Sequence, residues 1–324
     1  MDVELERVTY RFRQPIATAY GTLTERELLV LRLRDEDGHE GLGEAAPLEP
    51  YDGVTVEEAE GAIRAGGTGP PQAAAALDIA RADLSSQIEG RPIAQAQTDR
   101  PAGSVPVNAA ITATDRAGAA REAAGAVEAG FGTVKLKVGV GDDAGRVAAV
   151  RAAAGPDVAI RIDANGAWEV DQAVAALRSL APAGIELCEE PVRGVAALAA
   201  VRAALAGEVA IAMDESASES GAIGSGACDF VCLKVARCGG LTGLWAAAET
   251  GRRAGSRVYV ASTYDGPIGI AAGLHAAAAL GPDIPACGLA TLSLFENVVD
   301  PFPARDGRIE VPGGPGLGVT WPVG

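Results

Sequence analysis

The pattern of hydrophobic and polar positions divides the chain into two parts. In the first part, three segments have the alternating or apolar pattern of strands in an antiparallel meander, namely residues 3–8, 28–33 and 40–45. Two later segments have apolar residues at helical spacing, namely residues 55–61 and 71–89. Residues 99–104 have the composition of a linker, so we expect an α+β domain over residues 1–98.

The pattern changes after this linker, where short runs rich in Val and Ile alternate with helical stretches rich in Ala. The strand-like runs are residues 105–108, 133–137, 159–163, 185–189, 209–214, 230–234, 258–261 and 286–289. A repeat of roughly 25 residues is typical of the βα units of a parallel barrel, which we expect over residues 104–298. An open doubly wound sheet is less favoured, because no glycine-rich phosphate loop follows the first run. We expect residues 299–324, rich in Pro and Gly, to pack back on the first domain.

Composition excludes several classes of protein. The 324 residues include 43 acidic and 27 basic side chains, giving a formal charge of −16, and no basic face is evident, so we expect no nucleic-acid partner. No uninterrupted apolar run reaches the roughly 18 residues of a membrane span. The amino-terminal residues lack a signal-peptide pattern, and the five cysteines are expected to be reduced, small and buried, so we expect a cytoplasmic protein. Both a monomer and a homo-oligomer remain open.

The chemistry is expected to reside in lysines and carboxylates, because the chain contains only two histidines. Ionisable side chains recur at or near the ends of five predicted strands: Lys135, Lys137, Asp163, Glu189, Asp214 and Lys234. In a parallel barrel these ends converge on the face that carries active sites. Taken singly, each carboxylate is also compatible with a helix cap and each lysine with a solvated rim charge. Taken together, the three carboxylates favour one Mg²⁺ ion and the lysines an anionic substrate.

Two of these lysines stand two residues apart, so their side chains share one face of a strand. Lys135 and Lys137 therefore both point into the barrel. We expect their mutual repulsion, together with the metal, to lower a lysine pKa far enough for a neutral amine to act as a base.

A set of motifs resembles the enolase superfamily, specifically its muconate-lactonising subgroup, over nearly the whole chain. The motifs are Lys135-Leu136-Lys137, Asp163-Ala164-Asn165-Gly166-Ala167-Trp168, Glu189-Glu190-Pro191, Asp214-Glu215-Ser216 and Leu233-Lys234. The resemblance implies a (β/α)7β TIM-type barrel with an N-terminal α+β capping domain completed by the C-terminal tail. It also implies that Asp163, Glu189 and Asp214 bind Mg²⁺, and that Lys137 and Lys234 face each other across the substrate.

Looser similarities point to one branch of the subgroup. Residues 261–269, 286–292 and 312–319 look like the corresponding segments of the o-succinylbenzoate synthases of actinobacterial type. That resemblance implies removal of a proton α to a carboxylate and β-elimination of water, taking 2-succinyl-6-hydroxy-2,4-cyclohexadiene-1-carboxylate to 2-succinylbenzoate in menaquinone biosynthesis. An N-acylamino-acid or dipeptide racemase or epimerase, or a cycloisomerase, remains an alternative. Residues 288–291 lack the Asp-x-Asp pair usual in dipeptide epimerases.

Further side chains are candidates for contacting the substrate or supporting the metal ligands. They are Lys135, Asn165, Glu190, Tyr20, Tyr51, Ser262 and Thr263. Glu190 follows the residue that matches the family's metal ligand, so we expect it to support the site from behind. Tyr20 and Tyr51 fall in the two capping-domain loops expected to select the substrate, although a core or hinge role would explain them equally well.

Overall fold

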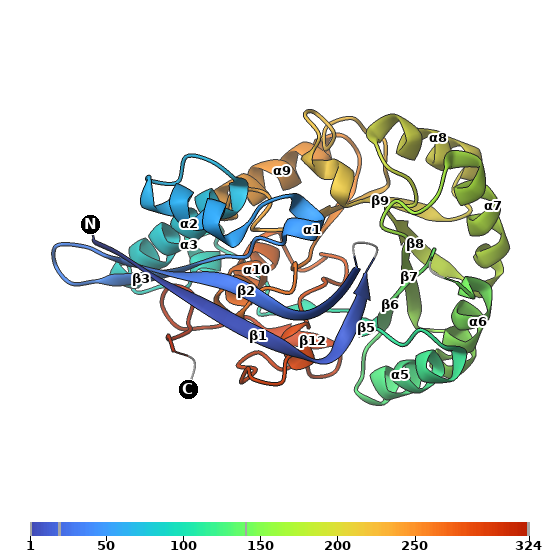
Figure 1. Cartoon of the computed structure of the whole chain (residues 1–324), viewed down its shortest axis with the longest axis horizontal. Coiled ribbons are helices and arrows are strands. Elements are labelled where there is room, and N and C mark those ends of the chain that lie inside the picture. Colours follow the sequence, from blue (N-terminus) through green and yellow to red (C-terminus); the bar gives the residue numbers. More distant parts are fainter. Residues whose placement is uncertain (1, 19–20, 140, 323–324) are drawn as a thin grey trace.

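A computed structural model describes residues 2–18, 21–139 and 141–322. The first part of the chain forms an antiparallel sheet with the order β1 (Asp2–Thr18), β2 (Gly21–Arg34) and β3 (Glu40–Ala45). Four helices follow: α1 (Glu49–Asp52), α2 (Val56–Arg64), α3 (Pro71–Ile88) and α4 (Ile93–Gln97). Figure 1 shows this unit in blue and cyan, with the sheet extending across the front of the molecule. The predicted meander and helices are thus present.

Close packing of β3 on α3 holds the capping unit together. A Cβ atom at Gly43 would lie 2.0 Å from the carbonyl oxygen of Ala76, and one at Gly41 would lie 2.1 Å from that of Ala80. Only glycine lets the two backbones approach so closely, and the alanines of α3 complete the contact. The sheet and α3 therefore form a compact support for the loops that face the second part of the chain.

The second part forms a curved parallel sheet of seven strands, adjacent in chain order. They are β5 (Ala109–Ile111), β6 (Thr133–Lys137), β7 (Ala159–Asp163), β8 (Ile185–Glu189), β9 (Ala210–Met213), β10 (Phe230–Leu233) and β11 (Arg257–Val260). The connecting α-helices are α5 (Arg116–Glu128), α6 (Asp143–Ala154), α7 (Val170–Leu180), α8 (Val195–Leu205), α9 (Leu241–Arg253) and α10 (Pro267–Ala279). In Figure 1, α5 to α8 lie outside the sheet. The predicted α/β barrel with its capping domain is confirmed.

The predicted first and eighth barrel strands pair with each other in parallel, but only through short bridges. Residues 104–106 (β4) also pair antiparallel with β12 (Arg308–Glu310), which was not predicted. Residues 106–108 also pair in parallel with Cys287, whose N–H donates to the Pro106 carbonyl oxygen at 2.7 Å and whose carbonyl oxygen accepts from the Asn108 N–H at 3.0 Å. Residues 286–289 form isolated bridges, in which Cys287 pairs with Val107 and Gly288 pairs with Ala261. These bridges close the barrel between β11 and the residues that precede β5.

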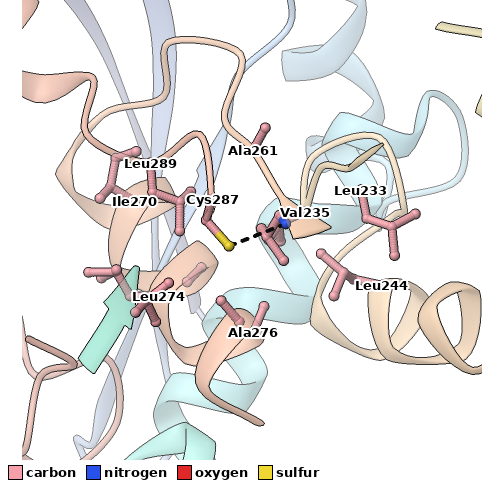
Figure 2. Close-up of a cluster of buried hydrophobic side chains, with 14 of the residues drawn as sticks. Leu233, Val235, Leu244, Ala261, Ile270, Leu274, Ala276, Cys287 and Leu289 are labelled. Carbon is pink, nitrogen blue, oxygen red and sulfur yellow. Dashed lines mark hydrogen bonds between the residues drawn. The ribbon is translucent and has the colours of Figure 1, made fainter. Parts of the chain in front are cut away.

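Nearly all residues of helix α10 are buried. Figure 2 shows part of this core, in which Ile270 and Leu274 of α10 gather with Leu289 and Cys287. A helix enclosed on every side needs no polar face, which explains its apolar composition. Its one histidine, His275, accepts from the backbone N–H of Ala94 at 3.4 Å and donates to the carbonyl oxygen of Leu317 at 3.1 Å.

The segment after residue 299 contacts the capping unit at several points. The backbone N–H of Leu317 donates to Asp83 at 2.7 Å, and the indole N–H of Trp321 donates to Glu6 at 2.7 Å. Short 3₁₀ turns complete the described elements at Ala181–Ala183, Glu215–Ser218 and Leu292–Leu294. Within the described ranges, no helix has both the length and the apolar character needed to cross a bilayer.

Candidate active site

Charged side chains converge where the barrel strands end. The register of the sheet places Lys137 beside Asp163, and Asp163 beside Glu189. Asp214 and Lys234 each follow directly after their strands, β9 and β10. These five side chains line a cavity of about 660 Å³, whose walls also include residues of the capping domain. The convergence follows from the fold, since equivalent ends of parallel strands meet at one face of a barrel.

Each carboxylate in this cavity is paired with a lysine. The Lys135 ammonium lies 2.9 Å from Asp163 and 2.6 Å from Glu189, so it joins two of the acids. Lys137 lies 2.8 Å from Asp163, and Lys234 pairs with Asp214. The three carboxylates are buried, and burial of charges is tolerated only when each has a partner. The site is therefore a cross-linked network rather than a set of independent charges.

The pairing shifts several pKa values. Burial raises the pKa of Asp163, but the ammonium groups of Lys135 and Lys137 outweigh that effect and hold it below its usual value. Burial and the neighbouring acids raise the pKa of Glu189 to about 7, against the opposing effect of Lys135. Burial lowers the pKa of Lys135 and Lys234, yet the adjacent carboxylates raise both well above the usual value. For Lys135 the carboxylate partners Asp163 and Glu189 thus outweigh burial.

The donor set fits a divalent cation that prefers oxygen ligands. Asp163, Glu189 and Asp214 supply three buried carboxylates, and one ammonium already bridges the first two. The ligand atoms of Glu189, Asp214 and Cys232 lie within 4.8 Å of one another. Cys232 is buried as expected, but its place beside the carboxylates was not foreseen. Its position two residues before Lys234 was the available signal, because alternate residues of a strand share a face.

Asn165 and Glu190 support the charged cluster from the adjoining loops. The Lys137 ammonium donates to Asn165 Oδ1, and the Asn165 amide donates to Glu215 at 2.9 Å. Glu190 accepts from the backbone N–H groups of Asp214 at 2.8 Å and Ser216 at 3.0 Å. Glu190 therefore holds the loop that carries Asp214, which is the supporting position proposed for it.

The capping domain reaches the cluster through Tyr51. The Tyr51 hydroxyl accepts from Lys234 at 2.7 Å and from Arg237 at 2.6 Å, and donates to Asp214 at 3.0 Å. Arg237, three residues after Lys234, was not among the predicted site residues. Tyr20, the other tyrosine proposed for a capping loop, lies outside the described residues.

Ser262 and Thr263 border the cavity on its uncharged side. The Ser262 and Thr291 hydroxyls lie 3.0 Å apart. Thr263 is held by its backbone, since its carbonyl oxygen accepts from Arg26 Nε at 3.2 Å. Arg26 also donates to the carbonyl oxygen of Pro47 at 2.7 Å, just before the loop that carries Tyr51. This buried arginine, which sequence reasoning missed, joins the capping loop to the barrel.

Comparison with protein families places the chain among known proteins. Residues 118–322 match the model of the family described as enolase C-terminal domain-like. A relative from Thermobifida fusca named o-succinylbenzoate synthase is 41% identical over 201 residues, which cover 59% of this chain and 61% of that protein. One of the same name from Mycolicibacterium smegmatis is 34% identical over 313 residues, covering 92% of this chain and 83% of that protein. The first match thus spans about three fifths of the relative's length.

Solved structures similar to this one come from the muconate-lactonising subgroup. A muconate lactonizing enzyme from Pseudomonas fluorescens, complexed with muconolactone, superposes with a TM-score of 0.91 at 25% identity, covering 98% of this chain and 95% of that one. An N-succinyl Arg/Lys racemase from Bacillus cereus gives 0.90 at 25% identity, with 98% and 94% covered. A dipeptide epimerase from Enterococcus faecalis, complexed with Mg and L-Leu-L-Tyr, gives 0.89 at 26% identity, with 98% of each chain covered.

Proposed function

The chain belongs to the enolase C-terminal domain-like family, and from that premise we propose that it removes a proton α to a substrate carboxylate and then eliminates water. The substrate is 2-succinyl-6-hydroxy-2,4-cyclohexadiene-1-carboxylate, the product is 2-succinylbenzoate, and the step belongs to menaquinone biosynthesis. The name shared by the curated relatives supports this assignment. The observation that carries the proposal is a pair of lysines from opposite sides of the barrel. Lys137 ends β6 and Lys234 follows β10, with three strands between them.

We assign the metal site to Asp163, Glu189 and Asp214, which would hold one Mg²⁺ ion. When bound, the cation supplies stabilisation of the negative charge that develops on the substrate carboxylate as the α-proton leaves. Similar structures complexed with Mg support this choice of cation.

The two lysines have different surroundings, and we assign them different roles. The Asp214 carboxylate keeps the pKa of Lys234 well above its usual value despite burial, so this lysine is a fixed cation beside the anionic intermediate. The Lys137 side chain is 31% exposed, against 8% for Lys234, and it borders the cavity. Lys137 takes the α-proton and then delivers a proton to the departing hydroxyl, so that water leaves from the same face.

The shape and lining of the cavity suit a small anionic ring compound. Its volume of about 660 Å³ lies within the usual range for small-molecule sites. The capping domain contributes apolar walls from Ile16 and Leu23, and the lysines offer positive charge opposite them. The substrate carboxylate would thus lie at the charged end and its ring against the apolar walls.

Turnover of the cyclohexadiene in the presence of Mg²⁺ tests the assignment. Wild-type protein should form 2-succinylbenzoate, and Lys137→Ala should lower kcat by about 10²–10⁴-fold, the usual contribution of a general base. Arg178→Ala, on the outer surface of α7, is a matched control that should retain full activity. A wild-type protein that leaves the cyclohexadiene unchanged would overturn the proposal.

A second candidate is racemisation of an N-acylamino acid. Two lysines on opposite sides of one α-carbon can remove a proton from one face and return it to the other, and one similar structure is an N-succinyl Arg/Lys racemase. A dipeptide substrate is disfavoured, because residues 288–291 offer no carboxylate to an α-ammonium group. Exchange of the α-proton in D₂O across a panel of N-acylamino acids tests this activity, and absence of exchange rejects it.

A further inference from the structure

The barrel interior contains a buried polar pair beside the charged cluster, to which the proposed reaction assigns no role. Tyr259 on β11 is 2% exposed and Arg161 on β7 is 1% exposed. The Arg161 guanidinium carbon lies 5.0 Å from the centre of the Tyr259 ring. Arg161 is itself fixed, because Nε donates to Glu186 at 2.6 Å and Nη1 donates to the carbonyl oxygen of Ala286. Both side chains are therefore held in one arrangement.

The Tyr259 hydroxyl makes a specific contact with the carboxylate cluster. It donates to Glu189 Oε2, while the Lys135 ammonium donates to the other oxygen, Oε1, at 2.6 Å. The two oxygens of Glu189 are thus held by different partners. A carboxylate whose two oxygens each accept a hydrogen bond cannot rotate freely, so its orientation is fixed before a cation binds.

The side chain that faces Tyr259 from the adjacent strand is a small one, Cys232. The register pairs Cys232 of β10 with Tyr259, so both side chains point to the same side of the sheet. On β9, Ala212 pairs with Glu189, so these two side chains also point to the same side of the sheet. Both neighbours are small residues, and the Tyr259 hydroxyl contacts Glu189 on this inner side.

We propose that Tyr259 is a positioning residue for cation binding. Its hydroxyl holds the Glu189 carboxylate in one orientation and so raises the affinity of the carboxylate cluster for a divalent cation. Arg161 packs against the Tyr259 ring and keeps it in place. The inference rests on the proposed function only in taking Glu189 as a metal ligand. Because Tyr259 acts through Glu189, it is expected to alter metal affinity far more than turnover at saturating metal.

Tyr259→Phe tests the proposal directly, because it removes only the hydroxyl and leaves the ring over Arg161. Calorimetry with Mg²⁺, and electron paramagnetic resonance with Mn²⁺, should show Kd raised about 10- to 100-fold, the usual cost of losing a group that supports a metal ligand. The thermal midpoint without metal should stay near that of the wild type. Tyr10→Phe, a buried tyrosine of the capping sheet, is the control and should leave Kd unchanged.

A second variant keeps the proposal falsifiable if Tyr259→Phe does not fold. Arg161→Lys retains a charge near Glu186 but loses the planar group over the ring, and it should raise Kd by a smaller factor. A metal Kd within twofold of the wild type in either variant overturns the proposal. Turnover of the cyclohexadiene with no change of Kd in Tyr259→Phe would reject only this inference, whereas metal binding that depends on Tyr259 without such turnover would reject only the proposed reaction.

Discussion

The two sides of the cavity are built on different principles. From β6 to β10 the wall carries lysines and carboxylates that are paired with one another. From β11 to the closing segment the wall is neutral, consisting of Ala261, Ser262, Thr263, Gly288 and Thr291. On the charged side each group is fixed by its partners, so almost any substitution disturbs the whole network. On the neutral side substitutions can change the shape of the cavity without touching that network.

The two sides also differ in what lies behind them. The charged side is stabilised by ion pairs inside the barrel, whereas the neutral side rests on the apolar core around α10 (Figure 2). From this contrast we propose that the charged side determines the class of reaction, and that the neutral side and the capping domain determine which substrate undergoes it.

The largest expected effect comes from breaking the charged network at its centre. Asp163→Asn leaves Lys135 and Lys137 without a shared partner, and removal of one member of a buried ion pair costs about 3–5 kcal/mol of unfolding free energy. The Kd for Mg²⁺ should rise by more than the roughly 10- to 100-fold caused by losing a supporting group. Urea denaturation and calorimetry measure the two effects. Wild-type affinity for Mg²⁺ in this variant would show that Asp163 is not a ligand.

An intermediate effect on the free energy of unfolding is expected from protonation of His275, which would place a charge in the apolar core behind the neutral side. Burial lowers the pKa of His275 from 6.5 to about 4. The imidazole therefore stays neutral in the folded protein while the unfolded chain binds a proton, so stability is full above pH 6.5 and is lost as pH falls towards 4. At pH 5 the loss is about 2 kcal/mol.

Comparison with a variant isolates this contribution. His275→Gln can still donate and accept a hydrogen bond but does not titrate in this range. Urea denaturation from pH 7 to pH 5 should therefore show a steeper loss of stability in the wild type than in the variant. If the free energy of unfolding fell equally with pH in both proteins, His275 would not be a buried neutral imidazole. Glu44, whose pKa burial raises to about 8, is present in both proteins and cancels in the difference.

The smallest expected effect comes from the neutral wall itself. Ser262→Ala removes the hydroxyl that pairs with Thr291 and borders the cavity. Loss of one hydrogen bond of about 0.5–1.5 kcal/mol should change kcat/KM for the cyclohexadiene by roughly 2- to 12-fold. Steady-state kinetics and metal titration distinguish the two sides, because the Kd for Mg²⁺ should not change. A higher Kd for Mg²⁺ in Ser262→Ala would contradict the proposal that the two walls act independently.

Much of this architecture could be predicted, because local periodicity and the βα repeat depend on neighbouring residues. The meander, the helices of the capping unit and the parallel strands fall close to the predicted segments. The positions of Lys137, Asp163 and Glu189 follow directly from strand ends in a closed barrel. The antiparallel pairing of residues 104–106 with residues 308–310 was not predicted, because it depends on the tail rather than on local pattern.

The contacts that sequence reasoning missed join residues that are distant in the chain. Tyr259 reaches Glu189 across 70 residues, and Arg237 reaches Tyr51 across 186. Such contacts depend on the tilt of the barrel strands and on how the capping domain docks, and neither leaves a periodic signal. Arg26 was overlooked for the same reason, since its role is visible only once β2 lies against the barrel loop that contains Thr263.

The place where the barrel closes, between residues 104–108 and their partners near Cys287 and in β12, affects how the protein folds. The residues just before the first parallel strand are held on one side by Cys287 and on the other by β12, whose Arg308 donates to Ser104 across 204 residues. Contacts between such distant residues form slowly, because the intervening chain must first be ordered. During synthesis, nearly the entire chain must leave the ribosome before these contacts can form. Until then, the edge of the parallel sheet at β5 would remain unpaired.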